Sequence, residues 1–283
     1  MLALWAEMNV IVADEFRDGN VPAIQEPLRA ARCAFNALPA EVKERYFRGD
    51  SACYNEELLT WLRHEDRAEG PKGLIGFAVS APMVKPLKEE ILGVAEDQWK
   101  SHSADGEVIK ECANVPYYPE EQPENRYREP LRYVAIRVRK RQGQLFADGT
   151  QVKHFAVATN LWDWDAKKLL DWHREKAGSI EAAHDVIKNE LAGGVLPCAR
   201  FGSNAAWMRL AVIAYNVLTA MKRLALPAEL LRARPKRLRF LIFYTPGKLV
   251  HHARNLVLRL TRTLNRFSNW RGAFHKLPLP VPI

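Results

Sequence analysis

Strand-like and helical patterns alternate over the first 40 residues of the chain. Leu2–Ala6 and Asn9–Phe16 carry apolar residues at strand spacing, and we expect them to pair through a turn at Glu7–Asn9. The polar, proline-containing stretch Arg17–Pro22 ends this hairpin. Apolar residues then recur at helical spacing over Ala23–Leu38. The chain is therefore expected to open with a β-hairpin followed by a helix.

A short strand-like run then ends in an aspartate. Arg45–Gly49 leads directly to Asp50, and a helical pattern follows over Asn55–Arg63. Ligands of open α/β sheets bind beside the carboxyl ends of strands, so Asp50 is a candidate functional residue. A local explanation competes with this one, because aspartate is also a favoured N-terminal cap for a helix that follows it.

The middle of the chain predicts further strands. Gly73–Val79 and Lys153–Thr159 have the pattern of buried strands, and Val84–Val94 that of a helix. Between them, Gln98–Gln144 contains alternating apolar and polar residues, most clearly at Tyr133–Arg139, which predicts antiparallel strands. The order of these elements predicts an α/β fold with a mixed sheet.

Helical patterns dominate the last third. Helices are expected over Trp164–Trp172, Ser179–Leu191 and Asn204–Leu224. The last of these is apolar or small nearly all round, which argues for deep burial. In Lys236–Tyr244 basic and apolar residues alternate, and Gly247–Phe267 is predicted as a basic amphipathic helix.

The predicted helix Ser179–Leu191 carries two carboxylates and a lysine on one face. Glu181, Asp185 and Lys188 are spaced i, i+4 and i+7, so in a regular helix they project from the same side over about two turns. A carboxylate beside a lysine suits a metal ion next to a phosphate. The competing explanation is an ordinary exposed charge pattern on a helix.

Composition narrows the class of protein. With 283 residues, 48% of them hydrophobic and 27% charged, the chain has the make-up of an ordinary soluble globular protein. No apolar stretch approaches about 18 residues and the opening residues lack a secretory leader, so we expect no membrane span and a cytoplasmic location. Four scattered cysteines without zinc-ligand spacing are expected to be reduced thiols: Cys33, Cys53, Cys112 and Cys198.

The net charge of +9 is concentrated at one end. Of the 42 Lys and Arg residues, 12 lie in Leu231–Ile283, which contains no Asp or Glu. Residues 1–230 therefore hold 30 basic and 33 acidic residues, a balance of −3. Such a basic block is typical of salt-sensitive nucleic-acid binding. A solvated basic terminus or a membrane-surface helix would give the same composition.

Four segments together resemble the DDE-type transposases of bacterial insertion sequences, in the group whose ribonuclease-H-like domain is interrupted by a β-rich insertion before the last acid. The resemblance runs over nearly the whole chain. The segments that carry it are GDSACYNEELL around Asp50, ATNLWDWDAKKLLDWHREKAG before Glu181, LAGGVLPCARFGSNAAWMRLAVIAYNVL after it, and PGKLVHHARNLVLRL in the tail.

The resemblance implies a fold and a chemistry. It implies a ribonuclease-H-like mixed sheet in two parts, residues 1–96 and 151–228, a β-rich insertion at 97–150 and a basic C-terminal region at 229–283. It makes Asp50 the second and Glu181 the third acid of the DDE triad, binding Mg²⁺ or Mn²⁺. Two such ions can clamp an in-line displacement at phosphorus. Double-stranded DNA is the implied partner, with a homodimer assembling on it.

The chain departs from the family at the strand expected to carry the first acid. The family's second, third and fourth strands can be placed before Asp50, but no opening strand precedes them, and Asp14 and Asp18 do not replace its acid. We therefore expect an N-terminally truncated transposase that binds DNA and cuts it weakly or not at all. The alternatives are a non-catalytic DNA-binding remnant, and a chain that does not fold because the missing strand leaves two open edges.

Basic and aromatic residues are the candidate DNA contacts. In many relatives a tyrosine and an arginine stand seven and four residues before the last acid, and a lysine seven after it. Here these positions hold Arg174, Ala177 and Lys188, so only the lysine agrees. Lys188 is expected to hold the phosphate beside the cut, and Arg174 either replaces the arginine or forms a surface ion pair. The other expected contacts are backbone contacts by Arg259, Arg262 and Arg266, and stacking of a flipped base on Trp162, Trp164 or Trp172, with Trp207 expected in the core.

Overall fold

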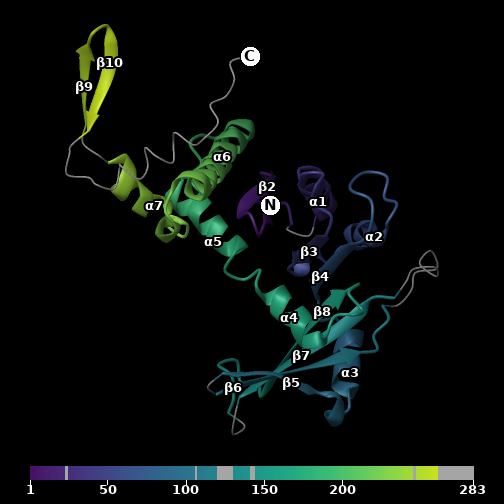
Figure 1. Ribbon diagram of the computed structural model, residues 1–283. Coiled ribbons are helices and arrows are strands. Elements are labelled where there is room, and N and C mark those ends of the chain that lie inside the picture. The colour runs from purple at the N-terminus through teal and green to yellow at the C-terminus, as the bar shows by residue number, and fades with distance from the viewer. Residues whose placement is uncertain (23–24, 106, 120–129, 141–143, 245–246, 261–283) are drawn as a thin grey trace. The chain divides into compact units, whose positions relative to one another are not determined.

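The computed structural model describes residues 1–22, 25–105, 107–119, 130–140, 144–244 and 247–260 (Figure 1). The chain forms two compact units. The first contains Gly19–Ser179 together with Met1, and the second contains Leu2–Asp18 and the residues from Ile180 onward. The expected four-part division of the chain stays a prediction.

A six-stranded mixed sheet forms the centre of the first unit. Its strand order is β3-β4-β8-β7-β6-β5, with β3 parallel to β4 and every other pair antiparallel. The strands expected before Asp50, around Gly73–Val79, in Gln98–Gln144 and at Lys153–Thr159 are confirmed. Their bounds are β3 Arg45–Gly49, β4 Ile75–Ala81, β5 Lys100–Asp105, β6 Val108–Val115, β7 Arg132–Lys140 and β8 Val152–Thr159.

Helices cover both faces of this sheet because side chains on successive strand residues point to opposite sides. Phe77 and Val79 of β4 pack with α1 (Pro27–Asn36) and α2 (Glu56–Arg63). On the same face, α3 (Lys85–Gly93) places Leu87 and Ile91 against β7 and β8. The opposite face carries α4 (Ala166–Arg174), whose Leu169 and Leu170 meet Ala78, Val134 and Val157. Short 3₁₀ turns lie at Ser51–Cys53 (η1) and Glu96–Gln98 (η2).

The second unit is built on the long helix α6 (Phe201–Ala225). The expected N-terminal hairpin is confirmed as β1 (Leu2–Trp5) and β2 (Val10–Asp14), which pair with each other in a sheet of their own. The side chain of Asn216 holds β2 to α6 by accepting from the Ile11 amide and donating to the Ile11 carbonyl, both at 2.8 Å. A side chain on α6 therefore satisfies backbone groups of β2.

The stretch Ser179–Leu191 is helical as predicted, but it is not one regular α-helix. The chain forms a short α-helix, α5 (Ile180–Asp185), and then a π-helical segment, η5 (Val186–Glu190). A π segment bonds i to i+5 rather than i+4, so it alters the face on which later side chains lie. Glu181 lies on α5 and Lys188 on η5, so their i, i+7 spacing does not place them on one face of a regular helix.

The deep burial predicted for α6 is also wrong. One side of α6 packs under the hairpin and α5 through Ala211, Val212 and Tyr215. The opposite side leaves Leu210 and Val217 about 60% exposed, at 59% and 60%. The helix is apolar on all sides, but only one of its sides is buried.

The C-terminal region differs most from its prediction. A short 3₁₀ turn, η6, lies at Ala228–Leu230. The stretch in which basic and apolar residues alternate then forms a short helix, α7 (Pro235–Leu238), and a π segment, η7 (Arg239–Phe243). The amphipathic helix predicted for Gly247–Phe267 is wrong over its described part, which is a hairpin of β9 (Gly247–His252) and β10 (Asn255–Leu260). Within the described ranges, no helix combines the length and apolar character needed to cross a bilayer.

Candidate active site

Strand β3 delivers Asp50 to the carboxyl end of the parallel pair β3–β4. Gly49 is the last residue of β3 and lies opposite Val79 of β4. The side chain of Asp50 is exposed, and its Oδ1 accepts a hydrogen bond from the Ala52 amide at 3.1 Å. The local capping role expected for Asp50 is therefore present, but at the 3₁₀ turn η1. Helix α2 is capped instead by Asn55, whose Oδ1 accepts from the Leu58 amide at 3.1 Å.

A polar cluster from α4, the turn that follows it and β4 holds the backbone immediately before Asp50. The ammonium of Lys176 donates to the Gly49 carbonyl at 2.6 Å and to Ser80 Oγ at 3.1 Å. His173 Nε2 lies 3.1 Å from the same carbonyl and 3.0 Å from Lys176 Nζ. The pattern of charges in the sequence did not single out Lys176, His173 or Ser80 for this position.

His173 is buried in this cluster, with 5% of its surface exposed. Burial, and then the charge of Lys176, lower its pKa from 6.5 to about 4. The imidazole is therefore neutral at pH 7, so its Nε2 either donates to Gly49 or accepts from Lys176, but does not do both. Lys176 thus provides the positive charge of the cluster.

An arginine also ties β3 to the end of α4. Arg48 donates to the Trp172 carbonyl at 2.6 Å and to Glu175 Oε2 at 2.9 Å. Its guanidinium also lies 5.4 Å from the centre of the Trp172 ring. These contacts, together with those of Lys176, fix the end of β3 against α4.

Cys53 and Gly49 pack directly under the Asp50 turn. A Cβ added to Gly49 would lie 2.6 Å from the Cys53 Cβ, so the turn leaves no room for a side chain at position 49. Burial, and then the nearby Asp50 carboxylate, raise the pKa of the Cys53 thiol to about 11. Cys53 is therefore a neutral packing residue at pH 7, and it is a free thiol, as the sequence predicted.

Glu181 belongs to the other unit. It lies near the start of α5 and is exposed. Asp50 and Glu181 are therefore in different compact units, and their meeting at one metal ion stays a prediction. The described residues contain no group of three or more His, Cys, Asp or Glu side chains placed to share an ion.

The basic tail neutralises the acids that follow Glu181 along the chain. Asp185 accepts from Asn189 at 2.6 Å and from Arg234, and these bonds lower its pKa in that order. Arg234 also pairs with Glu190, and Arg239 donates to the Glu190 carbonyl at 2.7 Å. Asp185 is thus engaged in ion pairing, which leaves Glu181 as the better metal-ligand candidate on this segment.

The predicted basic contacts Lys188 and Arg174 belong to different units. Lys188 is exposed on η5, and Arg174 is exposed in the last turn of α4. Two acids lie close to Arg174 in the sequence, and both contact other residues: Glu175 pairs with Arg48, and Asp171 lies 3.0 Å from His102. The roles of Lys188 and Arg174 in DNA binding stay predictions.

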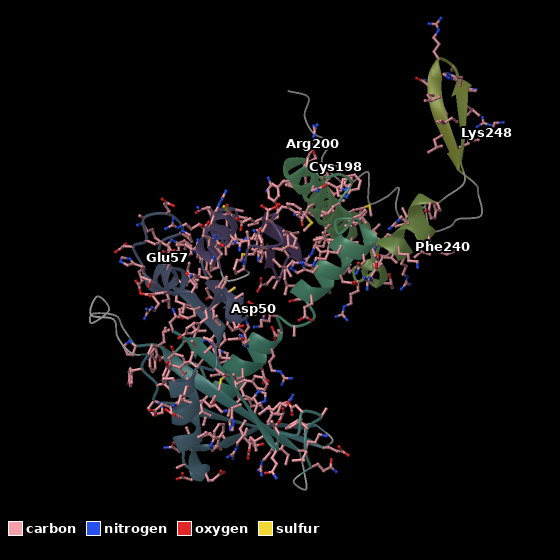
Figure 2. All side chains as sticks on the ribbon, turned by 180° about the vertical axis from the view of Figure 1, so that it is seen from behind. Asp50, Glu57, Cys198, Arg200, Phe240 and Lys248 are labelled. Atoms are coloured by element: carbon pink, nitrogen blue, oxygen red, sulfur yellow. The ribbon has the colours of Figure 1, made fainter. Side chains whose placement is uncertain are left out.

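The tail arginines lie only partly within the described residues. Arg259 is exposed on β10 and faces Lys248 of β9, which Figure 2 labels on the hairpin. Arg262 and Arg266 lie outside the described residues. The hairpin turns at Ala253 and Arg254, both with positive φ, as a two-residue turn between antiparallel strands requires.

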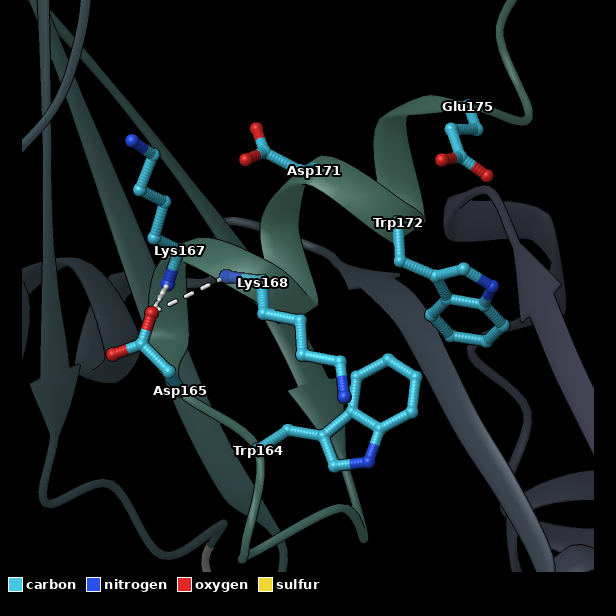
Figure 3. Close-up of a pocket in the computed structure, with 7 residues that line it drawn as sticks. All are labelled: Trp164, Asp165, Lys167, Lys168, Asp171, Trp172 and Glu175. Atoms are coloured by element: carbon cyan, nitrogen blue, oxygen red, sulfur yellow. Dashed lines mark hydrogen bonds between the residues drawn. The ribbon is translucent and has the colours of Figure 1, made fainter.

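Two tryptophans line a depression beside α4 (Figure 3). Trp164 and Trp172 lie edge to face, 5.5 Å apart, and Lys168 Nζ lies 4.1 Å from the Trp164 ring centre. The depression has a volume of about 530 Å³ and is lined by Trp164, Asp165, Lys167, Lys168, Asp171, Trp172 and Glu175. Trp162 is exposed. The core position expected for Trp207 is wrong, because it is 39% exposed and its indole nitrogen donates to the Ala192 carbonyl.

The structure is an α/β chain in which an acid, Asp50, directly follows a strand of a parallel pair, as expected from the transposase-like segments. The model of the family described as transposase DDE domain group 1 matches residues 2–279. The chain therefore belongs to this family of DDE transposases. No curated protein and no solved structure matches it.

Proposed function

We propose that this chain is the DNA transposase of a bacterial insertion sequence, with a ribonuclease-H-like core that cleaves a phosphodiester and transfers the cut strand. The observation that carries the proposal is the position of Asp50. It directly follows β3 at the carboxyl end of a parallel pair, beside a lysine-bound carbonyl, in a chain that belongs to the DDE transposases. Its partner is double-stranded DNA, on which a homodimer assembles.

The residues of this chain have distinct proposed roles. Asp50 and Glu181 hold Mg²⁺ or Mn²⁺, which when bound would stabilise charge on the attacking and leaving oxygens. Lys176 fixes the Gly49 carbonyl and so orients the backbone from which Asp50 projects. Lys188 contacts the phosphate beside the cut as a point charge, and Arg174 contacts the neighbouring backbone.

Cutting by this chain alone is proposed to be weak. Mg²⁺ commonly uses one or two carboxylates, with waters and substrate phosphate completing its shell. The family's chemistry uses three acids, and the transposase-like segments of this chain supply two of them, Asp50 and Glu181. One carboxylate from each unit gives fewer protein ligands than the family arrangement, so the metal is held less firmly and the reaction slows.

A nicking assay on a duplex that contains the element end tests this function. With Mn²⁺, we expect slow nicking that is lost in Asp50→Asn and in Glu181→Gln but retained in the control Asp185→Asn, whose carboxylate is ion-paired. Nicking that survives both substitutions would show that these acids are not the site. Fast cutting that Glu181→Gln abolishes would show that the acid set is complete.

A non-catalytic DNA-binding protein is the second candidate, and the hairpin β9–β10 favours it. Lys248 and Arg259 are directly opposite each other, and Arg254 stands at the turn, so like charges gather on one ribbon. A two-stranded ribbon fits the major groove of DNA. Under this function the chain binds DNA but nicks it at no measurable rate.

Filter binding across salt measures the contribution of this ribbon. Replacing Lys248, Arg254 and Arg259 by Gln is expected to reduce the slope of log K against log salt by about 3, since each phosphate contact contributes about 1. The matched control replaces the exposed Lys85 and Lys88 of α3 by Gln and is expected to leave the slope unchanged. An unchanged slope in the ribbon variant would place the DNA contacts elsewhere.

A further inference from the structure

The turn that carries Asp50 is a short, internally bonded segment that ends at Tyr54. The Asp50 carbonyl accepts a hydrogen bond from the Cys53 amide at 3.1 Å. The Ser51 carbonyl accepts one from the Tyr54 amide at the same distance. The Asp50 carboxylate accepts a third, from the Ala52 amide. Because these bonds close loops of only a few residues, a shift of Tyr54 would pass along the backbone to Asp50.

The side chain of Tyr54 is held by a second tyrosine, which comes from a strand far along the chain. Its hydroxyl lies 2.6 Å from the hydroxyl of Tyr133, so one of the two donates a hydrogen bond to the other. Tyr133 belongs to β7, which β4 and β8 separate from β3 in the sheet. The bond therefore links the end of the Asp50 turn to a strand that is not a neighbour of β3.

Tyr133 is a firmly packed anchor for this bond. Only 1% of its surface is exposed, and it lies in the core between the sheet and α3. The ring of Tyr117 packs edge to face against it, with the two ring centres 5.0 Å apart. A large side chain in a close-packed core has little freedom to move. The hydroxyl of Tyr133 is therefore a fixed point to which Tyr54 is bonded.

The paired hydroxyls lie in mainly apolar surroundings. The core around Tyr133 includes Leu87, Ala135 and Ala158. Burial raises the pKa of Tyr54 and of Tyr133, so both hydroxyls stay protonated at pH 7. A phenylalanine would fill the same space without taking a hydroxyl out of water, and a buried hydrogen bond adds little net stability. The main effect of the Tyr133 hydroxyl is thus to select one position for Tyr54.

We propose that Tyr133 is a positioning residue for Asp50, acting through the hydroxyl of Tyr54 and the turn that joins Tyr54 to Asp50. This role rests on the proposed function, in which Asp50 holds a divalent ion. Lys176 fixes the backbone just before Asp50, and the tyrosine pair fixes the backbone a few residues after it. The carboxylate thus projects from a segment that is held at both ends.

The direction of the Asp50 side chain depends on the order of this turn. The side chain is exposed, and its carboxylate bonds to the Ala52 amide within the turn itself. It therefore moves with the turn rather than with the body of the sheet. A metal ligand has to be held within about 0.5 Å of its productive position. A looser turn would consequently weaken the binding of an ion at Asp50.

Thiol labelling of the full chain, without metal or DNA, tests whether the tyrosine pair orders the turn. Cys53 lies in the turn, and Cys112 is buried on β6 in the same unit, so the two thiols report local and general opening separately. The exposed Cys33 and Cys198 are first replaced by Ser. Tyr133→Phe is expected to raise the labelling rate of Cys53 about fivefold, the factor that corresponds to one hydrogen bond, and to leave that of Cys112 unchanged.

Tyr54→Phe removes the same bond from its other side. We expect it to change the labelling of Cys53 as much as Tyr133→Phe does, and the double variant to add nothing, because all three lack one bond. Equal rises at Cys53 and Cys112 would show that the Tyr133 hydroxyl only stabilises the sheet. An unchanged rate at Cys53 would show that the turn is ordered without it. Either result would overturn the proposal.

Titration with Mn²⁺ tests the effect on Asp50 itself. Tyr133→Phe is expected to raise the dissociation constant about fivefold, less than the roughly 10–100-fold found for direct partners of metal ligands. The matched control is Thr159→Val, which removes a buried hydroxyl that donates to the Phe77 carbonyl of the same sheet and should leave the constant unchanged.

The two measurements separate the failure of this role from the failure of the proposed function. Faster labelling of Cys53 in Tyr133→Phe with an unchanged Mn²⁺ dissociation constant would overturn the positioning role. In a wild type that bound no Mn²⁺ the proposed metal site would fail, and the labelling alone would decide whether Tyr133 orders the turn.

Discussion

Replacing Lys176 by Met removes the only charge in the polar cluster before Asp50 and keeps most of the side chain's length. In the wild type its ammonium donates to the Gly49 carbonyl at 2.6 Å and to Ser80 Oγ at 3.1 Å. A hydrogen bond that involves a charged group contributes about 1.5–3 kcal/mol. His173 still lies 3.1 Å from the same carbonyl and can donate to it, so the loss falls towards the lower end. We expect Lys176→Met to lower the free energy of unfolding by about 2 kcal/mol.

The same substitution has a second readout. Because the charge of Lys176 lowers the pKa of His173, removing it should raise that pKa towards its ordinary value. Urea denaturation followed by tryptophan fluorescence measures the stability, and NMR titration of the imidazole protons measures the pKa. The control is Lys167→Met, which replaces an exposed lysine on α4, the helix that precedes Lys176. If Lys176→Met matched the control in both readouts, the ammonium would not hold the Asp50 turn.

Two further predictions follow from the packing of this turn. Between pH 6.5 and about 4 the wild type should lose up to about 3 kcal/mol of unfolding free energy. The reason is that His173 in the unfolded chain binds a proton in this range, whereas the folded imidazole, with its pKa of about 4, stays neutral. His173→Gln should flatten this part of the pH profile, and an unchanged slope would contradict the assignment. Gly49→Ala should cost about 1–3 kcal/mol in thermal or urea unfolding, since its Cβ would overlap Cys53. The control Gly93→Ala meets nothing within 4 Å, and equal effects of the two substitutions would refute the packing argument.

The strands around Asp50 could be predicted because their signals are local. Arg45–Gly49 is short and is followed at once by polar residues and a helix, so the end of β3 was fixed by the sequence next to it. The N-terminal hairpin was predictable for the same reason. The contact of Lys176 with Gly49 was not, because the two residues are 127 positions apart and meet only when α4 packs on the sheet.

The hairpin β9–β10 shows how one pattern can fit two structures. Apolar residues at Leu249, Val250, Leu256 and Val257 satisfy helical spacing, yet Leu249–Leu258 and Val250–Val257 are also cross-strand pairs. A two-residue turn of this kind usually contains Asn or Gly, but Ala253 and Arg254 occupy it here. The sequence therefore lacked the turn signal that would have distinguished a hairpin from a helix.

The apolar composition of α6 was interpreted as burial because a helix without a polar side is usually enclosed. The structure separates two roles within that composition. Asn216 and Tyr215 bind the hairpin through hydrogen bonds to Ile11 and Asn9, while the opposite side has no partner among the described residues of its unit. Sequence periodicity shows that a surface is apolar but not which molecule covers it.

Binding of Mn²⁺ to the protein alone tests most directly whether Asp50 and Glu181 form one site. The free ion is followed by electron paramagnetic resonance while the protein is titrated. The account predicts one bound ion per chain, lost equally in Asp50→Asn, in Glu181→Gln and in the double variant, and retained in Asp185→Asn. Unchanged Mn²⁺ binding in either single variant would show that the two carboxylates do not share a metal ion.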